Sequence, residues 1–190
     1  MLSSITPLGQ RGRGMSWGRT VVAFWVGAIA AGASVFSVAG VVGTIIGLRT
    51  LNLWFAVLVV AVAATLDILR VRPPGPHRQV DENSLGRYRD WVVGFGYGAQ
   101  LGFGLATIIP TWGIWALLLV SASVGLPGAA VIGASFGVGR SLLLLANRSV
   151  TSPGALSETM RRFAGAESAA KHAAIGAYAL AIVMIGLNVV

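Results

Sequence analysis

Two charged residues stand inside otherwise apolar stretches of this sequence. Asp67 and Arg140 are the only charged residues within its long apolar segments. Charge is costly in hydrocarbon, so an ionisable residue at membrane depth is a functional candidate by default. The structural alternative is that both side chains lie near helix ends and reach the membrane interface. A mutual Asp67–Arg140 ion pair is compatible with either role.

A proline within a long apolar segment marks the same region as a candidate site. The segment from Trp91 to Leu126 has 36 residues, and as one helix it would extend about 54 Å, well beyond the hydrocarbon thickness. Pro110 lacks a backbone donor, which predicts a break around it. Transporters bind ions and substrates at such breaks; a plain proline kink is the alternative. The candidate intramembrane polar site comprises Asp67, Gln100, Thr107, Pro110, Thr111 and Arg140, with Trp112 beside it.

Glycines recur at four-residue spacing in three apolar segments. Such faces allow close approach of helices. They either seal the bundle internally or dock another chain. The candidate packing faces comprise Gly43 and Gly47, then Gly94, Gly98 and Gly102, and finally Gly133 and Gly137.

Several kinds of chemistry are not indicated. The chain has no cysteine, which excludes disulfides, thiolate metal sites and thiol relays. His77 and His172 are isolated, and no metal-ligand spacing, catalytic triad or phosphate-binding loop stands out. We therefore predict no enzyme activity, no cofactor and no metal. The thirteen arginines and one lysine are spread over several loops, which argues against nucleic-acid binding.

Composition indicates the elements that must position these residues. Of the 190 residues, 55% are hydrophobic and 11% are charged, and the mean hydropathy is +0.78. These values predict an all-α, polytopic integral membrane helix bundle whose residues 1–190 form one transmembrane domain. The polar stretch from Arg70 to Asp90 is interpreted as a surface loop, and the stretch carrying Arg148 to Lys171 as another. The expected spans are 21–48, 53–69, 91–126 (broken), 127–147 and 173–190.

The distribution of basic residues predicts the topology. If segment 91–126 crosses once, twelve basic residues lie on one side and only Arg49 lies opposite; if it crosses twice, the split is eight against five. The positive-inside rule favours five net crossings of the cell membrane, with the N-terminus cytoplasmic and the C-terminus on the other side. The N-terminal segment imitates a secretory signal, but its apolar stretch continues to Leu48, which predicts a retained span.

From Leu85 to its end, the layout resembles the second half of the CcdA/DsbD family of cytochrome c biogenesis proteins, which carry reducing equivalents across membranes. The glycine-rich run from Gly94 to Gly104 leads into Thr107-Ile108-Ile109-Pro110, as a broken helix bearing Cys-x-x-Pro does in that family. The resemblance implies a related bundle with Thr107 at the cysteine position. The family's first span is missing here, and threonine cannot exchange thiols, so thiol–disulfide transfer does not carry over.

Three functions are compatible with the sequence. The leading hypothesis is a non-enzymatic membrane subunit, a scaffold or accessory in a transport or biogenesis complex, packed through its glycine faces against other membrane subunits or itself. The alternative is a small transporter or channel that uses the Pro110 break, with Asp67 and Arg140 as gating or coupling charges. The third is a degenerate cytochrome c biogenesis protein without thiol chemistry. The lipid bilayer is the expected partner in each case.

Overall fold

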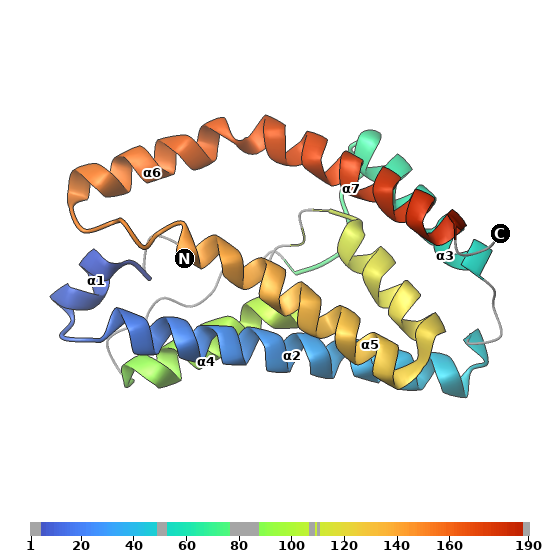
Figure 1. Ribbon diagram of the computed structural model, residues 1–190, viewed down its shortest axis with the longest axis horizontal. Coiled ribbons are helices and arrows are strands. Elements are labelled where there is room, and N and C mark those ends of the chain that lie inside the picture. Colours follow the sequence, from blue (N-terminus) through green and yellow to red (C-terminus); the bar gives the residue numbers. More distant parts are fainter. Residues whose placement is uncertain (1–4, 49–52, 77–87, 107–108, 110, 188–190) are drawn as a thin grey trace.

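The computed structural model describes residues 5–48, 53–76, 88–106, 109 and 111–187. Within these ranges every regular element is a helix and there is no strand, which confirms the all-α class (Figure 1). The helices are α1 (Pro7–Gly12), α2 (Trp17–Ile45), α3 (Leu53–Ile68), α4 (Asp90–Phe103), α5 (Gly113–Leu145), α6 (Pro153–Gly165) and α7 (Glu167–Leu187).

Two helical stretches are long and apolar enough to cross a membrane, Trp17–Ile45 and Gly113–Leu142, by length and composition. The second is interrupted, because Gly125 has φ 74° and ψ 177°, and the chain reverses direction there (Figure 1). We call residues 113–124 the first arm of α5 and residues 126–145 the second arm. At 1.5 Å per residue the first arm is about 18 Å long and the second about 30 Å. Only the second arm is long enough to cross alone.

The predicted break in the third apolar segment coincides with the gap between α4 and α5. The helix α4 ends at Phe103, and Gly104 follows with φ 73°, a left-handed conformation that glycine adopts without a Cβ clash. The described residues between Gly104 and Trp112 are not helical. Pro110 itself lies outside the described residues.

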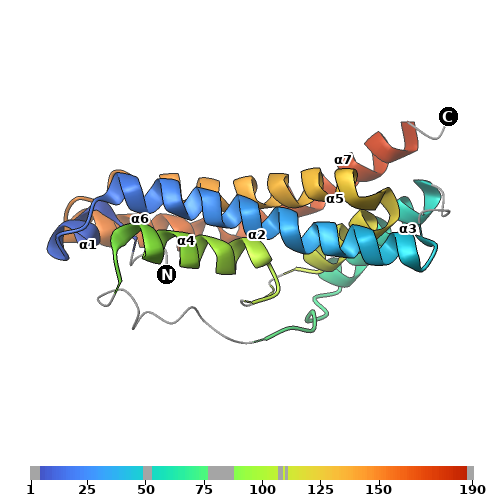
Figure 2. The same ribbon diagram turned by 90° about the horizontal axis from the view of Figure 1, so that it is seen from below.

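The helix α2 lies between α4 and α5 (Figure 2). Three glycines of α4 face backbone carbonyls of α2 so closely that an added Cβ would overlap the carbonyl oxygen. The pairs are Gly94 with Thr20, Gly98 with Phe24, and Gly102 with Ala28. Residue numbers rise together along both helices, so α2 and α4 run parallel.

The second arm of α5 packs on α2 in the same close manner, but antiparallel. An added Cβ at Gly133 or Gly137 would overlap the carbonyl oxygen of Gly32 or Ala28, respectively. Gly43 lies equally close to Ala122 at the end of the first arm. The one predicted packing glycine that lies elsewhere is Gly47. It follows the end of α2 with φ 78°, and an added Cβ would meet nothing within 4 Å, so it ends the helix instead of packing.

The helices α3 and α7 lie side by side as a second group (Figure 1). The expected loop from Arg148 to Lys171 is wrong in part, because α6 and the start of α7 occupy much of it. Pro153 stands in the first turn of α6, and the Ser152 hydroxyl accepts a hydrogen bond from the Ala155 amide at 3.3 Å. These are favoured features of a helix start.

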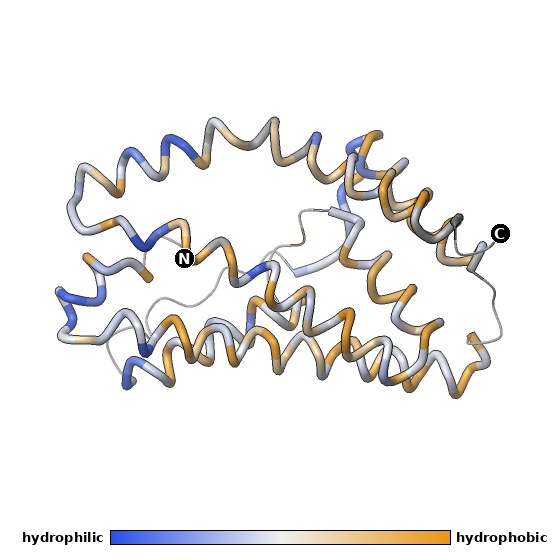
Figure 3. The backbone as a smooth tube through the Cα atoms, viewed as in Figure 1, coloured by the Kyte–Doolittle hydropathy of each residue, from blue (hydrophilic) through white to orange (hydrophobic). Residues whose placement is uncertain are grey.

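Polar residues gather at one end of the bundle, where α1 and α6 lie (Figure 3). There α1 packs into the bundle, with Ile5 and Gln10 fully buried. The Leu8 amide donates to the Val150 carbonyl at 3.1 Å, and the Thr20 hydroxyl donates to Gln10 Oε1 at 3.3 Å. The N-terminal segment is therefore tied to α2 and to the connection between α5 and α6.

Candidate functional site

The carboxylate of Asp67 joins three parts of the chain. It stands in the last turn of α3, where Oδ1 accepts a hydrogen bond from the Trp112 amide at 2.9 Å. Its Oδ2 accepts a second from the hydroxyl of Tyr178, in α7, at 2.5 Å. Asp67 therefore connects α3 to the start of α5 and to the middle of α7.

The position of this carboxylate follows from the chemistry of a helix end. The first amides of a helix have no partner within it, and its N-terminus carries a partial positive charge. Trp112 is the residue directly before α5, so its amide is such a donor, set free by the break. A carboxylate is the side chain that best satisfies both properties. The Asp67 carboxylate therefore caps the helix start that the break leaves open.

The residues that follow α3 are hydrogen-bonded to the start of α5. Arg70, with φ 58°, is the one non-glycine residue with a positive φ in the described part of the chain, and it turns the backbone into an extended stretch. The indole nitrogens of Trp112 and Trp115 donate to the carbonyls of Val71 and Pro74 at 2.9 and 3.1 Å, respectively. The start of α5 is thereby held to the residues that follow Asp67.

Gly113 leaves room for the polar side chains at the start of α5. A Cβ added at Gly113 would lie 2.7 Å from the Tyr178 hydroxyl oxygen and 3.3 Å from Thr111 Oγ1. Thr111 and Tyr178 are both half-buried. Two hydroxyls and one carboxylate thus converge beside a glycine, an arrangement that can hold or pass a proton.

The structure brings together only some of the predicted site residues. Asp67 and Thr111 lie in the cluster just described, whereas Gln100 is exposed on α4. Thr107 and Pro110 lie outside the described residues. Arg140 lies on the second arm of α5.

The hypothesised Asp67–Arg140 ion pair does not form. The acceptor groups of Asp67 face Trp112 and Tyr178, and no ion pair between Asp67 and Arg140 is present in the described chain. The Arg140 guanidinium carbon lies 5.5 Å from the centre of the Phe136 ring, a cation–π geometry. Its buried Nη1 has no hydrogen-bond partner. The two charges are separate features.

Sequence reasoning missed Tyr178, which the structure places against Asp67. A signal was present, because Tyr178 is the only tyrosine in the last apolar stretch, 173–190. A hydroxyl-bearing ring in such a stretch needs a partner. Nothing in the local sequence indicated that the partner is Asp67, 111 positions earlier.

Among the described residues, no group of three or more histidine, cysteine or acidic side chains could hold a metal ion. Comparison with known proteins gives no matching family model, no similar characterised protein and no similar solved structure.

Proposed function

We propose that this protein is a small multi-pass membrane transporter in which Asp67 couples the binding of a proton or cation to movement at the break before α5. The observation that carries the proposal is the placement of Asp67. One carboxylate satisfies the helix start that the break leaves open, and the same carboxylate holds α7 through Tyr178.

The packing of the helices supports a rigid part and a movable part. Backbone contacts at glycines fix α2 to α4 and to the second arm of α5, and close-packed interfaces of this kind resist gradual deformation. The helix α7 packs mainly on α3, and α3 packs on both α7 and α5 without the close backbone contacts of α2. Asp67 lies where this pair meets the first arm of α5. A change in its charge therefore acts between the two parts.

Protonation gives the coupling a direction. Ionised Asp67 is stabilised by the Trp112 amide and by the positive end of α5. A proton on the carboxylate removes that charge, so both hydrogen bonds weaken and α3 and α7 gain freedom relative to α5. A cation bound beside Asp67 would compete with Tyr178 for Oδ2 with the same effect.

The proposed topology has five net crossings of the cell membrane. In this arrangement α4 and the first arm of α5 together form one discontinuous span, with lengths of about 21 and 18 Å, and the second arm forms the next. The N-terminus is cytoplasmic and the C-terminus lies on the other side, as the basic residues favour.

The test is whether water reaches the break. The chain has no cysteine, so a single Thr111→Cys variant in lipid vesicles can be labelled with a small water-soluble thiol reagent. The matched controls are Val131→Cys, an exposed apolar position on α5, and Ser157→Cys, an exposed position on α6. We expect Thr111→Cys to react about tenfold faster than Val131→Cys, because only the thiolate reacts and it forms in water. Equal rates for these two variants mean a dry break and overturn the proposal.

A second variant tests the role of the charge. In the Thr111→Cys background, Asp67→Asn removes the carboxylate charge, and we expect the labelling rate at one fixed pH to change severalfold. Glu158→Gln, which removes an acid on α6, is the control. If Asp67→Asn leaves the labelling rate unchanged, as Glu158→Gln is expected to do, Asp67 has no coupling role.

A subunit or scaffold function is the second candidate. The glycine faces that suggested it are largely occupied within the chain, so a partner would dock elsewhere. The observation in its favour is the thin attachment of α7, whose Ile175, Leu180 and Val183 are 42, 63 and 55% exposed. Gentle extraction followed by native mass spectrometry separates the candidates. Stoichiometric membrane partners favour the subunit, whereas a pure monomer or homo-oligomer favours transport. A degenerate cytochrome c biogenesis role is a third proposal, and it is supported by the sequence resemblance alone.

A further inference from the structure

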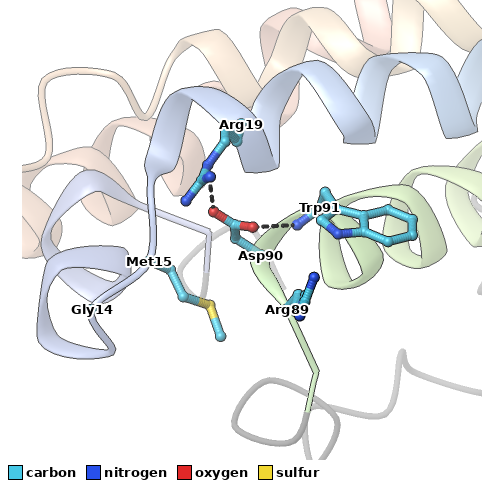
Figure 4. A pocket seen from close by; sticks show the side chains of 6 residues that line it. All are labelled: Gly14, Met15, Arg19, Arg89, Asp90 and Trp91. Atoms are coloured by element: carbon cyan, nitrogen blue, oxygen red, sulfur yellow. Dashed lines mark hydrogen bonds and ion pairs between the residues drawn. The ribbon is translucent and has the colours of Figure 1, made fainter.

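A cavity lies at the polar end of the bundle, away from Asp67. Its volume is about 440 Å³, and it is lined by Gly14, Met15, Arg19, Arg89, Asp90 and Trp91. Figure 4 shows Arg19 reaching down from α2 and Arg89 and Trp91 standing at the start of α4. Two arginines from different parts of the chain therefore face one hollow.

The single acid in this cavity is already compensated. Asp90 Oδ1 accepts from the Trp91 amide at 2.9 Å, and Oδ2 accepts from Arg19 Nε at 2.9 Å and from the Ser16 amide at 3.4 Å. The Asp90 side chain is 8% exposed, whereas that of Arg19 is 72% exposed. Asp90 thus holds Arg19 by Nε and leaves the two terminal nitrogens of its guanidinium facing outward.

Arg89 supplies the uncompensated charge. Within the described part of the chain, no acidic side chain pairs with it, and it is exposed. With two guanidinium groups and one carboxylate, the cavity carries a net positive charge. Paired arginines with free fork nitrogens match the oxygens of a phosphate group.

An apolar track begins at the rim of the cavity. Trp91, Phe95 and Phe103 are exposed on α4 by 54, 43 and 43%, and spacings of four and eight residues place them on one side of a helix. Tryptophan favours the membrane interface. A charged cavity followed by an apolar surface matches a phospholipid, in which a charged headgroup is followed by an acyl chain.

We infer that this cavity binds a phosphate group, that of an acidic phospholipid headgroup, between Arg19 and Arg89, with an acyl chain along Trp91, Phe95 and Phe103. The site lies at the end of the bundle where basic residues gather, and that end faces the acidic cytoplasmic leaflet in the proposed topology. The inference uses the membrane location and is independent of the transport role of Asp67.

The experiment is native mass spectrometry of the full chain, with phosphatidylglycerol or phosphatidylcholine added to the detergent solution. We expect the wild type to retain phosphatidylglycerol preferentially, and Arg89→Gln to lower that affinity about fivefold, the typical effect of one arginine near an acidic lipid. Arg89→Lys should restore most of the affinity. Arg148→Gln removes the same charge from an exposed position at the same end of the bundle and should bind as the wild type does.

Competition identifies the source of the phosphate. If millimolar inorganic phosphate leaves phosphatidylglycerol bound, the site takes a lipid. If it displaces the lipid and binds alone, the arginines bind phosphate but the lipid assignment is wrong. Equal losses in Arg89→Gln and Arg148→Gln, or no preference between the two lipids, indicate a diffuse basic surface and overturn the site. A separate thermal unfolding measurement shows that each variant is folded.

Discussion

The hydroxyl of Tyr178 donates a hydrogen bond to the Asp67 carboxylate at 2.5 Å, although the two residues stand 111 positions apart. Asp67 is the last charged residue before α3 ends, and Tyr178 lies near the middle of α7. The contact fixes the register of α7 on α3. Because the same carboxylate binds the Trp112 amide, it also fixes both helices relative to α5.

Tyr178→Phe should lower the free energy of unfolding by about 1–2 kcal/mol, since it removes a hydrogen bond between helices to a charged group. The measurement is thermal unfolding of the purified chain in detergent. Tyr88→Phe is the matched control, because Tyr88 is 57% exposed. If both variants unfold alike, the Tyr178 contact contributes nothing measurable.

Gly98→Ala should destabilise the bundle by about 1–3 kcal/mol, the typical effect of overpacking. Its added Cβ would overlap the Phe24 carbonyl oxygen and force α2 and α4 apart. Gly96→Ala, two residues away on the same helix, meets nothing within 4 Å and should be neutral or stabilising by up to about 1 kcal/mol. Unfolding of both variants in one detergent gives the comparison. Similar losses at the two positions contradict the packing described.

Asp90 should make stability depend on pH in the acid range. Burial raises the pKa of Asp90, but hydrogen bonds from the Trp91 and Ser16 amides and the charge of Arg19 lower it by more, so it lies below the ordinary 3.8. A depressed carboxyl pKa contributes stability above the unfolded value and loses it as pH falls through the folded value.

Asp90→Asn should therefore unfold at a lower temperature than the wild type at neutral pH. That difference should shrink as pH falls from about 5 to below 3.8, because the wild-type carboxyl takes up its proton. Glu158→Gln controls for the loss of one acid. A difference between wild type and Asp90→Asn that is constant with pH would falsify the role of the Asp90 charge.

Single cysteines should establish the topology. Gly12→Cys and Ser157→Cys lie near the polar end of the bundle, and Ile46→Cys lies at the opposite end of α2. With five net crossings, the first two react with an impermeant maleimide from the cytoplasmic face, and Ile46→Cys reacts from the other face. Labelling of Gly12→Cys and Ser157→Cys from opposite faces indicates an odd number of crossings between them and contradicts the five-crossing topology.

The sequence was most informative where the cause is local. Apolar composition predicts helices, and the length of segment 91–126 together with Pro110 predicts an interruption, because a helix of that length does not fit the bilayer. The four-residue spacing of Gly94, Gly98 and Gly102 likewise indicates one small-residue face. Each of these follows from properties of a single segment.

The sequence was least informative about which segments meet. Asp67 pairs with Tyr178 and not with Arg140, because the reversal at Gly125 carries Arg140 onto the second arm of α5. The helix α6 was also missed, because its polar residues carry no hydropathy signal, although Ser152-Pro153 is a recognisable helix start. Contacts between distant segments depend on registers that no local pattern specifies.

The carbonyl of Ala28 touches two glycines at once, Gly102 of α4 and Gly137 of α5. All three helices meet at this one residue. During synthesis α2 is made first, and its partners follow some seventy and a hundred residues later. The backbone around Ala28 is therefore left without its own helical partners until α4 and then the second arm of α5 have been made.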